Sequence, residues 1–225
     1  MKLSAVHLAR VLAFVESFDL NPRGAVFYPD LVKGMAEKFG FKKFPQKPED
    51  FDEIKGLEFI GGTWGDVTVE KLTIYQNGLL LDTRVSTAES ERIIEEGLAW
   101  GVKEFGLVYE AKMIKRRGYL SNLTFYSDCP TLLRSNSPVS KLNERIYDSV
   151  SKISGDKTPW EPIVLTFHSE AIPRKPVGAA FTIQRRAETS FSENKYYSEA
   201  PLPTGEHIAM LEAFEADVIA SIFKS

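Results

Sequence analysis

The chain has 225 residues, of which 43% are hydrophobic and 26% are charged, and this composition is typical of a folded protein rather than a disordered one. Its 28 Lys and Arg against 31 Asp and Glu give a formal net charge of -3. This balance removes the electrostatic reason to expect binding of nucleic acid or anionic membranes over the whole surface. The single cysteine, Cys129, excludes an intramolecular disulfide and a multi-cysteine metal cluster.

The first 20 residues do not have the pattern of a targeting segment. His7 and Arg10 interrupt the apolar stretch that a secretory signal needs, and no clear small-x-small cleavage site follows. No window approaches the run of about 18 apolar residues that a membrane helix requires. We therefore expect a cytoplasmic protein without membrane contact.

The first elements expected along the chain are a strand and a helix. Residues 8–18 place apolar side chains at even positions, which favours a strand, although a helix of this length also fits. A helix is predicted over residues 29–39, because its first residue is a proline and Gly40 suits a left-handed end. A short strand over residues 56–60 and a glycine-rich turn over residues 61–66 follow.

The clearest strand signal is a hairpin over residues 72–83. Asn77 and Gly78 separate two extended runs, and this dipeptide is typical of a type I′ turn, which needs positive φ at both positions. If these two residues form the loop, Ile74 opposes Leu81. The apolar face of the hairpin then consists of Leu72, Ile74, Leu79 and Leu81.

A bulge is expected before the hairpin and a helix after it. Val67 and Val69 lie in the opposite phase to the apolar face of the hairpin, which predicts a β-bulge near Glu70. A helix is predicted over residues 87–105, because Ser86 begins a capping box and a glycine follows the last apolar residue.

The second part of the chain repeats this order of elements. Strands are expected over residues 118–127, 162–168, 180–186 and 195–199. Helices are expected over residues 138–153 and from residue 204 onwards. The helix over residues 138–153 carries an apolar stripe that includes Leu142 and Ile146, which is typical of a helix that packs on a core. An exposed or partner-facing stripe is the alternative.

These elements predict an α+β protein with a mostly antiparallel sheet and with helices on one face. The order β-α-β-β-β-α occurs twice, over residues 1–110 and 111–225, and the two halves are expected to pack as one compact unit. An internal duplication and a coincidence of short patterns both explain this repeat.

The sheet face away from the helices is the expected binding surface, together with the segment that follows Arg185. This segment combines basic and aromatic residues, and its Phe191 either anchors a partner or folds back onto the sheet edge. The candidate binding residues are Asn122, Tyr126, His168, Gln184, Arg186, Phe191 and Tyr196. An ordinary solvated face explains the same polar residues.

No motif assigns a catalytic or cofactor site. The histidines His7, His168 and His207 do not have the spacing of metal ligands, and no phosphate-binding loop or nucleophile elbow occurs. Asp128 beside Cys129 disfavours a reactive thiolate. We therefore assign no catalytic residue, and we expect neither a metal nor a cofactor.

The leading interpretation is a non-catalytic cytoplasmic binding or interaction protein, such as a subunit of a larger assembly. A protein partner or a homo-oligomer is expected first, a small-molecule ligand second, and nucleic acid third. Two alternatives stay open. One is a hydrolase-type enzyme that uses His168 with a carboxylate. The other is a single-stranded nucleic-acid binder that uses Arg185, Arg186 and Tyr196.

Overall fold

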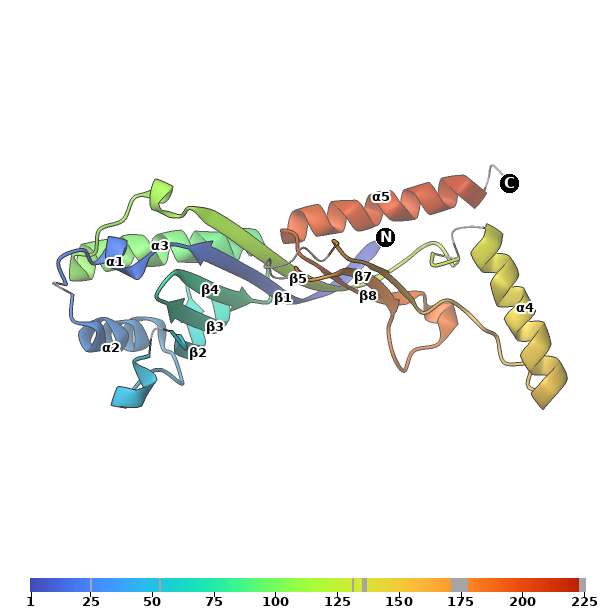
Figure 1. Cartoon of the computed structure of the whole chain (residues 1–225), viewed down its shortest axis with the longest axis horizontal. Helices are drawn as coiled ribbons and strands as arrows, with labels where there is room; N and C mark the ends of the chain where they lie inside the picture. Colours follow the sequence, from blue (N-terminus) through green and yellow to red (C-terminus); the bar gives the residue numbers. More distant parts are fainter. Residues whose placement is uncertain (25, 53, 131, 135–136, 171–177, 223–225) are drawn as a thin grey trace. The chain divides into compact units, whose positions relative to one another are not determined.

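The computed structural model describes residues 1–24, 26–52, 54–130, 132–134, 137–170 and 178–222. Within them the chain forms five α-helices and eight strands, and the strands join in the order β2-β3-β4-β1-β5-β8-β7-β6 (Figure 1). The strand pairs of known register are antiparallel. The predicted α+β class with an antiparallel sheet is therefore confirmed.

The elements follow the predicted order. The first set is β1 (Lys2–Phe14), α1 (Ser17–Leu20), α2 (Tyr28–Phe39), β2 (Leu57–Trp64), β3 (Val67–Tyr75), β4 (Gly78–Thr83) and α3 (Thr87–Phe105). The second set is β5 (Arg116–Tyr126), α4 (Ser137–Ser154), β6 (Val164–Phe167), β7 (Phe181–Arg185), β8 (Lys195–Ala200) and α5 (Thr204–Ile222). Short 3-10 helices occur at Pro48–Asp50, Ala111–Met113 and Phe191–Glu193. None of the described helices is both long and apolar enough to span a bilayer.

The chain forms two compact units, which are described separately. The N-terminal unit comprises residues 6–121 and 201–205. The C-terminal unit comprises residues 1–5, 122–200 and 206–225.

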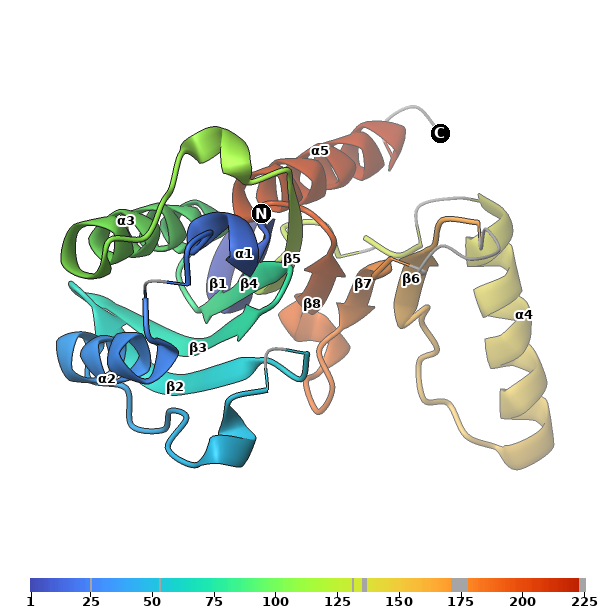
Figure 2. The ribbon, with the colours of Figure 1, turned by 60° about the vertical axis from the view of Figure 1, so that its left-hand side comes forward.

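The core of the N-terminal unit lies between its strands and the helices α2 and α3 (Figure 2). In its second half, the strand β1 buries its odd-numbered side chains, which are Ala9, Val11 and Ala13, and not the even-numbered ones whose apolar character favoured a strand in the sequence. In α2, Phe39 stacks on Trp64 with ring centroids 4.0 Å apart and contacts Trp100 of α3 edge-on at 5.1 Å. The predicted first strand is too long at its C-terminal end, because α1 begins at Ser17 and leaves Phe18 exposed.

The hairpin between β3 and β4 forms, but its predicted turn is wrong. Tyr75 pairs with Gly78, so Gln76 and Asn77 form the loop. Neither Asn77 nor Gly78 is among the described residues with positive φ, so the turn is not type I′. The register moves by two residues and Ile74 pairs with Leu79. Because the shift is an even number, the apolar face is the predicted one.

The structure gives Gly78 a different role from the predicted one. A Cβ atom at Gly78 would lie 2.8 Å from the carbonyl oxygen of Ala13 in β1. We expect Gly78→Ala to lower the free energy of unfolding by about 1–3 kcal/mol, because two backbones would have to separate. Chemical denaturation measures this loss. Gly118→Ala is the control, since its Cβ would meet Leu12 Cβ at 3.8 Å, and equal losses in the two variants would contradict the explanation.

Several local predictions are confirmed. The register of β3 against β4 shifts between Val69 and Lys71, which is the predicted bulge at Glu70. The helix α3 has the predicted bounds, and the Ser86 side chain accepts a hydrogen bond from the backbone N–H of Glu89. The predicted glycine-rich turn begins later than expected, because residues 61–64 belong to β2.

In the C-terminal unit, α5 packs on one face of the strands, which we call the α5 face. His207 of α5 contacts Ser198 of β8 and the ring of Phe181 of β7. The spacing of Ile208, Leu211, Val218 and Ile222 predicts one apolar face for this helix, and the structure buries Leu211 and Val218 but leaves Ile222 48% exposed. Side chains alternate along a strand, so the residues that lie between those of the α5 face point to the opposite face of the sheet.

The prediction that α4 packs its apolar stripe on a core is wrong for part of the stripe. Leu142 is 56% exposed and Ile153 is 87% exposed. The helix is amphipathic and has the predicted bounds within one residue at each end. Sequence pattern alone does not say whether an apolar stripe faces the core of its own chain or a partner.

Candidate interaction surface

The seven predicted binding residues lie on two faces of the C-terminal unit. Register pairs Gln184 with Tyr197 and Arg185 with Tyr196, so Tyr196 shares the side of Arg185. Five of the candidates alternate onto the opposite face. They are Asn122, Tyr126, His168, Gln184 and Arg186, of which the last three are exposed. The structure thus brings these five to one face and separates Phe191 and Tyr196 from them.

Phe191 and Tyr196 enclose the guanidinium group of Arg185. The Cζ atom of Arg185 lies 4.9 Å from the centroid of the Phe191 ring and 5.1 Å from that of Tyr196. Arg185 also donates a hydrogen bond of 3.1 Å to the carbonyl oxygen of Phe191. Phe191 therefore folds back onto the protein, which is one of the two arrangements expected from the sequence.

A buried ion-pair cluster completes this arrangement. Glu161 binds the Arg185 guanidinium, and Arg134 Nη2 lies 2.7 Å from Glu161 Oε1. The Arg185 side chain is 6% exposed and Tyr196 is fully buried. Burial raises the pKa of Tyr196. This geometry does not favour stacking of a nucleic-acid base on Tyr196, because base stacking requires an accessible ring.

His168 follows the last residue of β6. Its side chain is exposed, and the structure gives it no carboxylate partner among the described residues. The described residues contain no group of three or more His, Cys, Asp or Glu side chains that could hold a metal ion.

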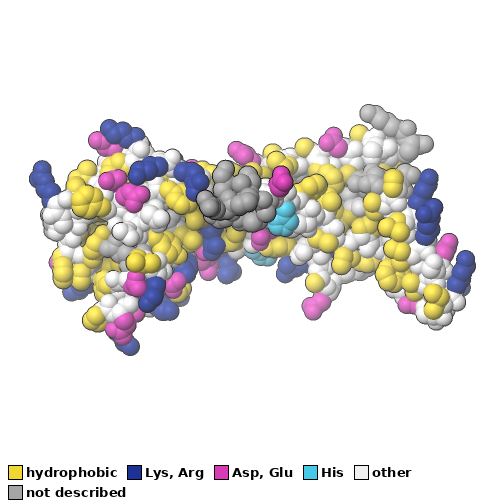
Figure 3. Space-filling view, viewed as in Figure 1, with side chains coloured by type: hydrophobic (Ala, Val, Ile, Leu, Met, Phe, Trp, Pro, Cys, Tyr) yellow, Lys and Arg dark blue, Asp and Glu magenta, His cyan; other side chains and the backbone are white. Residues whose placement is uncertain are grey.

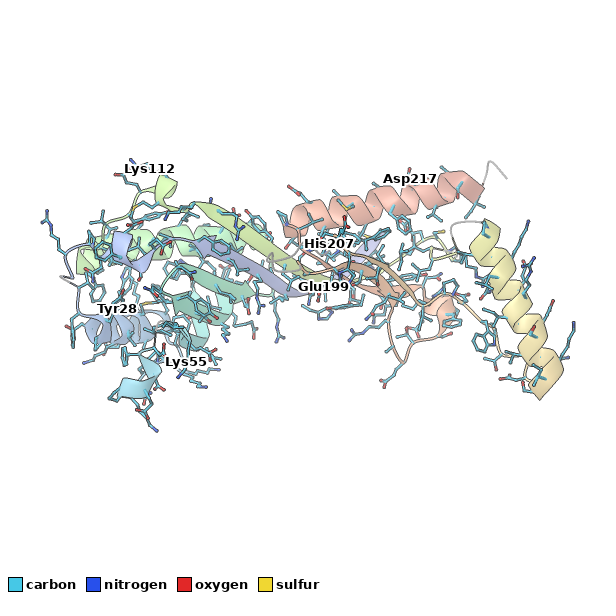
Figure 4. All side chains as sticks on the ribbon, in the orientation of Figure 1. Tyr28, Lys55, Lys112, Glu199, His207 and Asp217 are labelled. Carbon is cyan, nitrogen blue, oxygen red and sulfur yellow. The ribbon has the colours of Figure 1, made fainter. Side chains whose placement is uncertain are left out.

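The histidine that the structure places in a specific environment is His207, which sequence reasoning left without a role (Figure 4). Its Nε2 atom lies 2.8 Å from Ser198 Oγ, and Ser198 donates a hydrogen bond of 2.6 Å to the Thr182 carbonyl oxygen. Burial lowers the pKa of His207 to about 4. Ser198 and His207 are both fully buried, so this pair is structural and does not meet a substrate. The sequence did contain a signal for this burial, because His207 lies four residues before Leu211 and therefore on the same apolar face of α5.

The strand β6 forms one end of the strand order, and its outer edge has no partner strand among the described residues. The backbone N–H of Arg185 donates a hydrogen bond of 2.9 Å to the carbonyl oxygen of Ile163. Because hydrogen-bonded pairs alternate in an antiparallel ladder, the backbone groups of Leu165 and Phe167 also point toward β7. The backbone groups of Val164 and Thr166 therefore point outward.

The strand β2, at the other end of the strand order, has a covered edge. The backbone N–H of Lys43 donates to the carbonyl oxygen of Ile60 at 3.2 Å, and the N–H of Ile60 donates to the Lys43 carbonyl oxygen at 2.8 Å. A segment of the chain itself thus protects the edge of β2, which is a common way to prevent edge-to-edge association.

Several apolar side chains on α4, on β6 and in the segment between these two elements are exposed. We call this set the β6 surface, and it consists of Leu142, Ile153, Trp160, Ile163, Val164 and Phe167. Their exposed fractions range from 44% to 87%. Hydrophobic atoms also reach the surface in the region of α4 in Figure 3. Clusters of exposed apolar side chains are typical of interaction sites.

Neither a protein-family model nor a curated protein sequence matches this chain.

Proposed function

We propose that the protein is a non-catalytic interaction protein and that it self-associates through the outer edge of β6. The observation that carries the proposal is an apolar strand edge that no described strand covers. A cytoplasmic location is part of the proposal, and a chain whose single cysteine is buried and free suits a reducing compartment.

Antiparallel pairing of two β6 strands about a two-fold axis fits the direction of the free backbone groups. If the axis passes through Leu165, Val164 lies opposite Thr166 of the partner subunit. These are the residues whose backbone groups point outward, so each donates and accepts one hydrogen bond in such a pair. A strand edge of this kind is self-complementary, as a two-fold interface requires.

The same register brings exposed apolar side chains together. Ile163, which is 60% exposed, lies opposite Phe167 of the partner subunit, and Phe167 is itself 56% exposed. An aromatic residue opposite a β-branched residue is a favourable cross-strand pair. Val164, which is 52% exposed, adds an apolar side chain on the other face of the paired strands, because side chains alternate along a strand.

An internal duplication is a further part of this proposal. Both sets of elements have the order β-α-β-β-β-α apart from the short helix α1, and the strand order reads 2-3-4-1 and then 5-8-7-6. In this correspondence β6 is the counterpart of β2. A segment of the chain itself covers β2, whereas no described strand covers the outer edge of β6, and a second copy at β6 would supply such a cover.

We expect the protein to sediment as a dimer at micromolar concentration and Val164→Lys to sediment as a monomer, because a charge on a strand edge opposes edge-to-edge pairing. Thr166→Pro tests the backbone, since the N–H that it removes points away from β7. Analytical ultracentrifugation measures both variants.

The matched control is Gln184→Lys, which adds the same charge on the exposed residue that pairs with Val164 inside the sheet. This variant is expected to remain a dimer. A monomeric wild-type protein, or a dimer that survives both Val164→Lys and Thr166→Pro, would show that β6 is not a self-association edge.

A further inference from the structure

The N-terminal unit contains a cavity of about 100 Å³ in its core. It lies between α2, α3 and the β3–β4 hairpin, and its walls are almost entirely apolar. Side chains from all three parts line it, including Leu31, Met35, Ile94, Leu98, Ile74 and Leu79. Tyr28, which begins α2 and is labelled in Figure 4, also lines the cavity. Ser17 and Asn21 are its more polar lining residues.

One wall of the cavity is a rigid set of aromatic rings. Trp64 stacks on Phe39 with an interplanar angle of 19° and donates a hydrogen bond of 2.7 Å from Nε1 to Glu96 Oε2. Gly97 of α3 faces the indole of Trp64, and a Cβ atom at Gly97 would lie 3.4 Å from Trp64 Cη2, which is an ordinary van der Waals contact. A ring held on several sides cannot move inward, so this wall does not collapse into the cavity.

Glycine within a helix is unfavourable, and α3 has a second one at the same cavity. A Cβ at Gly101 would lie 2.7 Å from Leu107 Cδ1, and both residues line the cavity. Both glycines lower the stability of the helix, and a larger residue at Gly101 would displace the end of the Leu107 side chain from its place in the cavity wall.

We propose that this cavity binds a neutral compound with a single aromatic ring. Apolar cavities of about 150 Å³ lined by Leu, Ile and Phe hold one benzene molecule and exclude water. The space of about 100 Å³ is of the same order, so we match it to one ring rather than to two fused rings. The aromatic wall favours a ring over an alkyl chain, because rings gain stacked and edge-to-face contacts.

Methionine methyl groups offer a direct test with an internal control. Of the four methionines, Met35 lines the cavity, whereas Met210 lies on the exposed side of α5. With the full chain labelled at the methionine methyl carbons, benzene is expected to cause a saturable ring-current shift of the Met35 signal in NMR spectra. The Met210 signal is expected to stay unchanged.

Two further arms define the site. Leu98→Phe fills the cavity and is expected to abolish the Met35 shift, and the dispersion of its other methyl signals reports whether the variant folds. Naphthalene is expected to cause no saturable shift in the wild-type protein. The absence of a Met35 shift with benzene, an equal shift of Met210, or saturable binding of naphthalene would overturn the proposal. Self-association through β6 does not affect these outcomes.

Discussion

Glu161→Gln is expected to lower the free energy of unfolding by about 3–5 kcal/mol, because it removes one partner of a buried ion pair. The Arg185 side chain is 6% exposed and lies between two aromatic rings, so it cannot turn to solvent without losing these contacts. Its carbonyl partner at Phe191 does not neutralise the charge. Urea denaturation followed by circular dichroism measures the loss.

Two variants distinguish a buried pair from a general effect of charge removal. Glu110→Gln removes an exposed carboxylate that lies 2.6 Å from Lys112 Nζ, and we expect no measurable change in unfolding. Glu161→Leu combined with Arg185→Met replaces the pair by apolar side chains and is expected to recover most of the loss. A loss below about 1 kcal/mol for Glu161→Gln would contradict the buried-pair explanation.

The sequence predicted the elements that depend on local rules. The left-handed ends at Gly40 and Gly106 have φ of 63° and 74°. The cap at Ser86 and the bulge at Glu70 also form where expected. Each of these features is set by the chemistry of a few neighbouring residues, which a sequence contains in full.

Features that depend on distant residues could not be predicted. The conformation at Gly78 follows from the approach of Ala13 in β1, which no local turn rule includes. The exposure of Leu142 depends on whether α4 meets a core, and its spacing is the same in both cases.

The candidate site was predicted in part, for the same reason. Strand alternation correctly groups Gln184 and Arg186 on one face of the sheet. Strand alternation does not show that Phe191 folds back over Arg185, because the conformation of this loop depends on its contacts with residues outside the loop. The free edge of β6 was also not predictable, since strand order is a property of the whole chain.

Acid is expected to destabilise the protein through His207. Burial lowers the pKa of this side chain to about 4, whereas an unfolded histidine has a pKa of about 6.5. Between these two values the unfolded chain binds a proton that the folded chain does not. Stability therefore rises with pH across this window and is lost as the pH falls from about 6.5 to about 4.

The expected loss from this one group is roughly 3 kcal/mol, which is the difference between the two pKa values expressed as free energy. It is measured as the unfolding free energy of the wild-type protein at a series of pH values, minus that of His207→Gln. The subtraction removes the carboxylates, which titrate in both proteins. His168→Gln is the matched control, because its side chain is exposed and its loss is expected to leave the profile unchanged. A profile for His207→Gln as steep as that of the wild-type protein would show that His207 does not control acid stability, and that its contact with Ser198 persists when the imidazole is charged.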